Sequence, residues 1–248
     1  MSYPQDGHGF FTRALDAEDR GRLDEAETAY QQAIVLFEEE GDAEQEQAAC
    51  HYNLGHLHLG MNRPGRAVTA YERALQLFRR SAGSGRHQAR THLILGSLLL
   101  EMERPREAEE HLLDALGQYL DAPHEPVDQA QCHVNLARVY EQGARTSQAV
   151  TAYNRALDFY QEAEDTAAEQ AECFTALGRL HEAAGRMLES GSAYAAAARL
   201  RRAAGRPPLG EDPAEEPAGG EEHPADREPP GGADAARDTG LVEGEDRP

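Results

Sequence analysis

The chain contains no lysine, and all 24 of its basic residues are arginine. We attribute this bias to a GC-rich coding genome and infer no function from it. Acidic residues outnumber the arginines, and the formal net charge at pH 7 is −21. Because an acidic surface repels phosphate backbones, nucleic acid is not an expected ligand.

Cysteines and long apolar runs are also scarce. Three cysteines in 248 residues are too few for a disulfide framework, and they suit a reducing compartment. No apolar run reaches the roughly 18 residues that a membrane helix needs. The first residues, MSYPQDGHGFF, lack the basic and apolar regions of a signal peptide. We therefore expect a cytoplasmic protein that does not enter a membrane.

The C-terminal segment, residues 207–248, has no aromatic residue except a single histidine, and it is rich in proline, glycine, alanine and glutamate. It carries thirteen acidic residues against three arginines. Such a segment cannot bury enough apolar surface to offset the entropy lost on ordering, so a disordered acidic tail is predicted. Residues 1–9 are predicted to be a flexible arm, and residues 10–206 to be the folded part.

The folded part repeats one pattern five times. The dipeptide Gln-Ala occurs four times at a step of 41 residues, and alanines and tyrosines recur at the same step. The recurring positions are Gln47, Gln88, Gln129 and Gln170; Ala33, Ala74, Ala115, Ala156 and Ala197; and Tyr30, Tyr71, Leu112, Tyr153 and Tyr194. Within each copy, apolar and small residues at steps of three and four predict two amphipathic helices. An all-α fold follows.

A small residue also recurs in the first predicted helix of every copy. It is Ala14, Gly55, Gly96, Ala137 and Gly178. A residue with almost no side chain lets the two helices of a hairpin approach closely, so this position is predicted to lie between them.

Four of these positions carry a resemblance to a known family. Gly55, Ala67, Tyr71 and Ala74 are similar to the pattern of the tetratricopeptide repeat, a helix-turn-helix unit of about 34 residues. Seven further residues add about two helical turns, which keeps the buried face where it was. With Asn-Leu-Gly at residues 53–55, the chain resembles the longer repeats of kinesin light chains and Leu-Gly-Asn repeat scaffolds. The resemblance implies an α-solenoid superhelix of five units, with a concave surface lined by the first helix of each copy.

The segment CHYNLGHLHLG, residues 50–60, places one cysteine and three histidines within nine residues. Equivalent positions in later copies hold His92, Cys132, His133 and Cys173. Residues one repeat apart should lie about 8 to 10 Å apart, too far to share one zinc ion. We therefore expect packing roles, with no metal, no cofactor and no Cys-His catalysis.

An arginine recurs in the turn between the two helices of each copy. These residues are Arg22, Arg63, Arg104, Arg145 and Arg186. One interpretation is a row of cations for an acidic partner. The favoured interpretation is an ordinary helix ending, because cations interact well with the C-terminal end of a helix dipole.

The resemblance further implies which side chains contact a partner. They lie on the first helices of copies two to five. They are Tyr52, Asn53, His56 and Leu59; Arg90, Leu93 and Ser97; Val134, Asn135, Arg138 and Glu141; and Arg179. Asparagine pairs with a peptide backbone, and arginine holds a carboxylate. Phe11, Leu15 and Ile94 stand where a carboxylate clamp needs polar groups, so an extended or helical partner segment is expected rather than a chain terminus.

Fold alone does not identify the ligand, and three functions stay open. The first is a non-catalytic scaffold or adaptor that binds a peptide segment of another protein. The second is a regulator in which a ligand or signalling peptide changes a partner's activity, and the third is an accessory subunit of an enzyme complex. Because no helix is predicted after residue 204, a homodimer through the C-terminal repeat is a further hypothesis.

Overall fold

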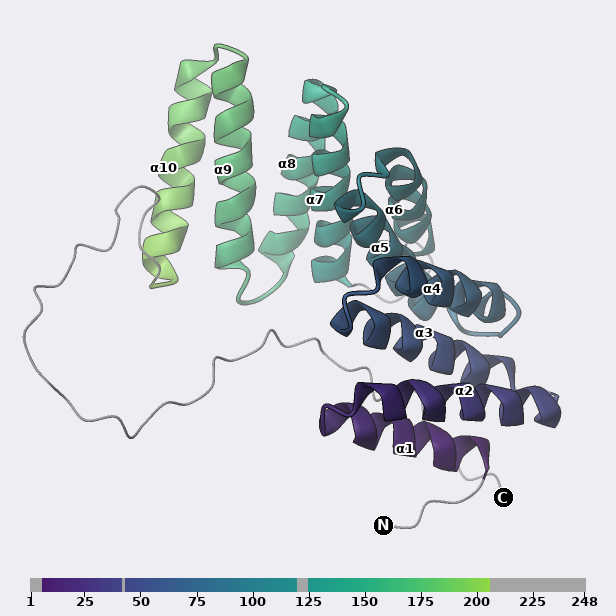
Figure 1. Ribbon diagram of the computed structural model, residues 1–248. Helices are drawn as coiled ribbons and strands as arrows, with labels where there is room; N and C mark the ends of the chain where they lie inside the picture. Colours follow the sequence, from purple (N-terminus) through teal and green to yellow (C-terminus); the bar gives the residue numbers. More distant parts are fainter. Residues whose placement is uncertain (1–5, 42, 120–124, 206–248) are drawn as a thin grey trace, which may run out of the picture. The chain divides into compact units, whose positions relative to one another are not determined.

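The computed structural model describes residues 6–41, 43–119 and 125–205 (Figure 1). The regular secondary structure within them consists of ten α-helices. In chain order these are α1 (Gly7–Asp19), α2 (Leu23–Glu40), α3 (Glu44–Gly60), α4 (Pro64–Phe78), α5 (Gly85–Glu101), α6 (Pro105–Tyr119), α7 (Pro126–Gln142), α8 (Thr146–Glu162), α9 (Ala167–Ala183) and α10 (Met187–Ala203). All ten belong to one compact unit, Met1–Pro208. The predicted tail, residues 207–248, lies outside the described residues.

Consecutive helices pair into five hairpins, which we number copies 1 to 5. Copy 1 is α1 with α2, and copy 5 is α9 with α10. The second helix of each copy also packs against the first helix of the next copy. Stacking of neighbouring hairpins is how an α-solenoid builds its core, so the predicted fold class and the five units are confirmed.

The first helix begins earlier than expected. The Asp6 side chain accepts a hydrogen bond of 2.7 Å from the Gly9 backbone N–H, which satisfies one of the unpaired donors at a helix N-terminus. Residues 7–9 are therefore helical, which corrects this part of the arm predicted for residues 1–9, while residues 1–5 lie outside the described residues.

All five first helices end in the same turn. The residue before each recurring arginine has a positive φ, and the arginine N–H bonds a carbonyl five residues back at 2.8 Å. The positive-φ residues are Gly21, Asn62, Glu103, Ala144 and Gly185. This is the Schellman ending of a helix, for which glycine has the lowest backbone cost. Its repetition explains why the arginines keep the 41-residue step.

The small residue of each first helix lies against the second helix, as predicted. A Cβ atom added at Gly55 would lie 2.5 Å from the Tyr71 ring, and one at Gly178 would lie 2.7 Å from the Tyr194 ring. Such distances are far inside van der Waals contact. In copies 2 and 5 the tyrosine ring therefore occupies the space that a Cβ atom would fill.

A glutamine links each of copies 2, 3 and 5 to the copy before it. The Nε2 atom of Gln47 donates to the Phe37 carbonyl at 3.2 Å, and Gln88 does the same to Phe78 at 3.1 Å. Gln170 repeats the contact in copy 5. The last carbonyls of a helix have no partner within the helix, so this amide satisfies one of them. The recurring Gln-Ala dipeptide is thus a junction between copies.

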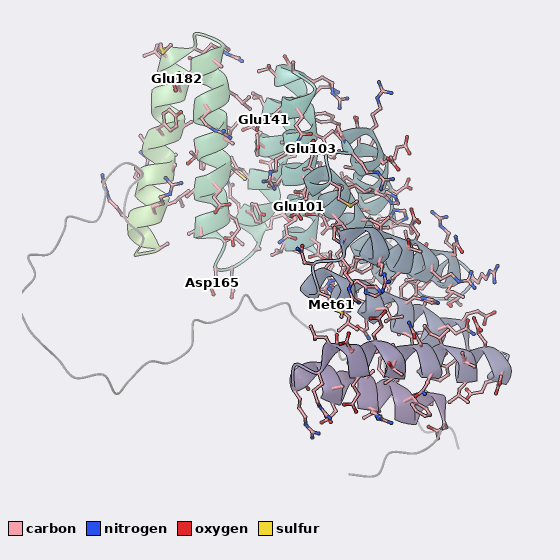
Figure 2. All side chains as sticks on the ribbon, in the orientation of Figure 1. Met61, Glu101, Glu103, Glu141, Asp165 and Glu182 are labelled. Atoms are coloured by element: carbon pink, nitrogen blue, oxygen red, sulfur yellow. The ribbon has the colours of Figure 1, made fainter. Side chains whose placement is uncertain are left out.

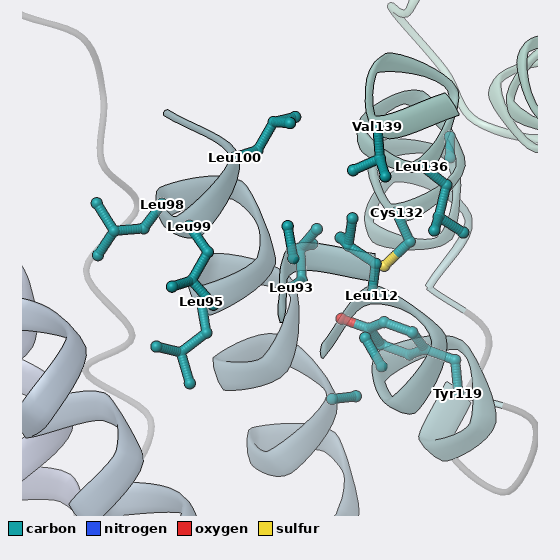
Figure 3. Close-up of a cluster of buried hydrophobic side chains, with 14 of the residues drawn as sticks. Leu93, Leu95, Leu98, Leu99, Leu100, Leu112, Tyr119, Cys132, Leu136 and Val139 are labelled. Atoms are coloured by element: carbon teal, nitrogen blue, oxygen red, sulfur yellow. The ribbon is translucent and has the colours of Figure 1, made fainter. Parts of the chain in front are cut away.

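A continuous hydrophobic core runs through the stacked hairpins, from Ala48 to Ala193. Figure 3 shows its middle part, where Leu93 of α5 lies near Leu112 of α6 and Cys132 of α7, while Leu95, Leu98 and Leu99 point to the other side of α5. A single hairpin could not bury its apolar side chains, because these side chains are covered by the hairpins stacked on either side of it.

Candidate functional site

Most of the predicted partner-contacting residues remain accessible on the first helices. Arg138 and Arg179 are exposed, and seven others are half-buried: Asn53, His56, Leu59, Arg90, Ser97, Val134 and Glu141. One repeat position, on the first helices α3, α5, α7 and α9 of four consecutive copies, holds His56, Ser97, Arg138 and Arg179. The 41-residue step therefore places polar side chains of rising positive charge at equivalent points along the stack.

Three predicted contact residues are buried. The exposed fraction is 7% for Tyr52, 5% for Leu93 and 8% for Asn135. The Tyr52 ring packs edge-on against Tyr71 at 5.7 Å between centroids, and Leu93 belongs to the hydrophobic core. Because each first helix contacts its hairpin partner and the preceding copy, less of its circumference is free than expected. These three residues are therefore removed from the set.

Glu141 and Leu59 occupy a position that serves the hairpin itself. The Tyr153 hydroxyl donates to Glu141 at 2.6 Å, and the Tyr194 hydroxyl donates to Glu182 at 3.1 Å. Figure 2 labels both glutamates, on the first helices of copies 4 and 5. Tyr30 and Glu18 form the same pair in copy 1. The pair joins residues twelve apart in three of the five copies. A carboxylate twelve residues before a recurring tyrosine was the sequence signal for it.

Copy 2 lacks this hydrogen bond because Leu59 stands in the position of the carboxylate. The Tyr71 hydroxyl is buried and has no hydrogen-bond partner within the described part of the chain. Leu59 and Val134 both pack against the core. The residues left for a ligand are Asn53, His56, Arg90, Ser97, Arg138 and Arg179, which we call the first-helix face.

His56 is neutral at physiological pH. Burial lowers its pKa to about 4, and the positive charge of Arg90 on the next first helix acts in the same direction. Its ring lies edge-on to Tyr52 at 4.7 Å and to Tyr71 at 5.5 Å. A neutral imidazole offers one donor and one acceptor, which suits hydrogen bonding to a peptide backbone.

The cations of the first-helix face are differently engaged. Arg179 lies 3.8 Å from Glu141 of the preceding first helix. Arg138 is exposed and makes no ion pair with any residue that the structure describes. Exposed pairs at such a distance contribute little free energy, so both guanidinium groups are accessible to a carboxylate from outside.

The cysteines of the 50–60 segment and of its repeats are buried in the helix packing. Cys50, Cys132 and Cys173 are free and buried, and burial raises the pKa of all three thiols, that of Cys173 to about 12. A thiol held protonated is a poor nucleophile and a poor metal ligand. Within residues 6–41, 43–119 and 125–205, no group of three His, Cys, Asp or Glu side chains is arranged to hold a metal ion.

Intramolecular ion pairs hold most of the recurring arginines. Arg63 contacts Glu27 of the preceding copy at 2.9 Å, and Arg145 contacts Glu109 at 2.7 Å. Arg22 and Arg104 pair instead with glutamates of their own copy. These contacts support the structural interpretation of the arginine row over a docking site for an acidic partner.

Comparisons with known proteins agree with this architecture. The family model for the tetratricopeptide repeat matches residues 11–80 and 87–162. No curated protein matches the chain significantly. Among the helices of the described residues, none is long and apolar enough to span a membrane.

Solved structures with the same fold are distant in sequence. BtubC (BKLC) from P. vanneervenii is 21% identical, with a TM-score of 0.70 over 89% of this chain and 87% of that one. RapI in its apo form is 16% identical, with a TM-score of 0.70 over 80% and 71%. YrrB, described as a TPR protein with an unusual peptide-binding site, is 15% identical, with a TM-score of 0.59 over 80% and 88%. With the family model covering more than half of its length, the chain belongs to the tetratricopeptide repeat family.

Proposed function

We propose that this protein is a non-catalytic scaffold or adaptor, and that its first-helix face binds a peptide segment of a partner protein. The observation that carries the proposal is the row of His56, Ser97, Arg138 and Arg179 at one repeat position on the first helices of four consecutive copies. Equally spaced polar groups suit a ligand that is itself a repeating polymer. A peptide backbone is such a ligand.

The chemistry of the face indicates which segment it would take. Asn53 and the neutral His56 supply donors and acceptors for backbone groups near copy 2. Arg138 and Arg179 supply positive charge near copies 4 and 5. The proposed ligand is therefore a segment whose acidic side chains lie at the end bound by α7 and α9. YrrB, with its peptide-binding site, provides a precedent within the fold.

The decisive experiment compares three forms of the full chain as baits in a lysate of the source cells. The first is the wild type, and the second carries Asn53→Ala, Arg138→Ala and Arg179→Ala. The third is a matched control with Asn154→Ala, Arg106→Ala and Arg199→Ala, which removes the same residue types from exposed positions on second helices. The wild type and the control should retain a common partner that the face variant loses. Equal retention by all three forms would contradict the proposal.

The same baits separate an adaptor from a ligand-responsive regulator. An adaptor binds its partner after small molecules have been removed from the lysate by gel filtration. A regulator regains binding only when the low-molecular-weight fraction is returned. The first outcome is expected, because the face already presents its charged groups without a ligand.

A further inference from the structure

A hollow lies between the second helices α6 and α8, over the first helix α7. Its volume is about 430 Å³, which falls within the usual range for small-ligand pockets. Leu136 and His133 of α7 form the floor, Leu113 and Leu116 of α6 form one wall, and Ala152 and Arg155 of α8 form the other. Most of this lining is apolar.

A small side chain, Ala152, lies in the α8 wall of the hollow, and the same repeat position is alanine in copies 1, 2 and 5 as well. Ala152 occupies the repeat position that His111 occupies in copy 3. In copy 3, His111 fills the corresponding place and brings its Nδ1 atom to 3.0 Å from Nδ1 of His92. His133 is the repeat equivalent of His92, and it stacks on Phe159 at 5.6 Å instead of meeting a second imidazole. The space above Leu136 is left open.

One wall of the hollow presents an unusual apolar surface. Leu113 is 50% exposed, although the same repeat position holds Gln31, Glu72 and Asn154 in copies 1, 2 and 4. Three copies therefore place a polar side chain where copy 3 exposes a leucine. An apolar group that entered the hollow would cover Leu113 and remove both surfaces from water, which is favourable.

The opposite wall carries a positive charge. Arg155 is exposed, and it makes no ion pair with the residues that the structure describes. Arg145, at the start of the same helix, is by contrast paired with Glu109 at 2.7 Å. The chain as a whole has a net charge of −21 and repels anions. An unpaired arginine beside the hollow can nevertheless attract an anionic group of a ligand to this place.

We propose that this hollow is a second peptide-binding site, independent of the first-helix face. It would take one bulky apolar side chain, such as leucine or phenylalanine, from a partner segment. An aspartate or glutamate within about one helical turn of that side chain would pair with Arg155. The ligand is thus an acidic segment with a single hydrophobic anchor.

The test uses the full chain and a phage-displayed library of random heptapeptides as the probe. Selected peptides are synthesised, and their dissociation constants are measured by fluorescence anisotropy. We expect a consensus with one bulky apolar residue and a nearby acidic residue. Ala152→His, which copies the filled arrangement of copy 3, should weaken binding at least about tenfold, the equivalent of 1.4 kcal/mol.

Two further variants and a control keep the test decisive if Ala152→His does not fold. Leu113→Glu installs the residue of copy 2 at a half-exposed position, and Arg155→Asp installs the residue of copy 3. Both should also weaken binding at least about tenfold. The Asn53→Ala, Arg138→Ala, Arg179→Ala variant should bind the peptides as the wild type does. Peptides without an acidic residue, or peptides whose binding survives Leu113→Glu, would overturn the proposal, as would a selection that yields no peptide sensitive to these changes.

Discussion

Copies 3 and 4 build the same hairpin with different chemistry. Copy 3 joins α5 to α6 through aliphatic contacts, with Leu112 against Gly96 and Leu100 in the position of the carboxylate. Copy 4 joins α7 to α8 through the hydrogen bond from Tyr153 to Glu141. The two copies also differ on their second-helix side, where His92 and His111 meet in copy 3 and Ala152 lines a hollow in copy 4.

The difference teaches that these positions change in pairs. A tyrosine occurs with a glutamate in copies 1, 4 and 5, and a leucine occurs with a leucine in copy 3. Copy 2 is the mismatch, since Tyr71 faces Leu59 and its hydroxyl has no partner within the described ranges. The backbone accepts either pair, because both fill the space while leaving no buried polar group unsatisfied.

The largest expected effect is the loss of stability at low pH that the buried histidine pair of copy 3 should cause. His92 is buried, and burial, His111 and Arg79 lower its pKa to about 4 while Asp114 opposes them. An unfolded histidine binds its proton near pH 6.5 and the folded one near pH 4, so the free energy of unfolding should fall as the pH drops through that window. The loss should reach roughly 3 kcal/mol at most. Chemical denaturation between pH 7 and pH 4 would measure it.

His92→Phe provides the control for this window, because copy 5 has Phe174 at the same position. The variant should lose less free energy of unfolding than the wild type between pH 6.5 and 4. Parallel pH profiles for the two proteins would show that His92 does not cause the loss.

The next largest effect on stability is expected when the hydrogen bond between Tyr153 and Glu141 in copy 4 is removed. Glu141→Leu should lower the free energy of unfolding by about 2 kcal/mol, because the Tyr153 side chain is only 4% exposed and its hydroxyl would lose its acceptor. Adding Tyr153→Leu recreates the pair of copy 3 and should recover part of that loss. If the double variant is less stable than the single one, the paired interpretation is wrong.

Removal of the tyrosine hydroxyl should stabilise the protein in copy 2 and destabilise it in copy 4. Tyr71→Phe removes a buried hydroxyl that has no partner in the described structure, and it should raise the free energy of unfolding by about 1 kcal/mol. Tyr153→Phe removes a satisfied hydroxyl and should lower it by about 1 kcal/mol. Thermal denaturation of both variants tests this, and a shift in the same direction for both would contradict it.

The smallest effect concerns the turns of copies 3 and 4. Glu103 has φ 57° and Ala144 has φ 54°, whereas copies 1 and 5 place glycine at that position. Glu103→Gly and Ala144→Gly should each raise the free energy of unfolding by about 0.5 to 1 kcal/mol, because relief of backbone strain exceeds the added entropy of the unfolded chain. Gly21→Ala is the converse variant and should lower the free energy of unfolding. A Cβ atom at Gly21 would meet nothing within 4 Å, so backbone strain alone would oppose this substitution.

The sequence was sufficient to predict the fold, because the repeats carry no insertion or deletion. The small residue at position 55 and its equivalents was correctly placed between the helices of a hairpin, since only Gly or Ala occurs there. The purpose of the Gln-Ala dipeptide was not predicted. A side chain that bonds a carbonyl ten residues earlier leaves no signal except its own recurrence.

The exposure of the predicted contact residues was harder to predict than the fold. Successive residues on a helix point about 100° apart, so the boundary between buried and accessible positions depends on how neighbouring copies pack. Tyr52 and Asn53 are adjacent, yet the first lies in the core and the second is half-buried. The hollow beside Ala152 was not predicted either, because it depends on a volume that no side chain fills.

The glutamine junctions have a consequence for how the chain folds. They join residues ten apart, the tyrosine pairs join residues twelve apart, and the widest side-chain hydrogen bond among the described residues spans 39. Because every such contact is short in sequence, little loop entropy is lost before it forms, and chains of low contact order fold rapidly. Several hairpins contain such local contacts, so folding can begin in any of them. Folding of this chain should therefore proceed outward from more than one nucleus, at a rate that a substitution in any single copy changes only modestly.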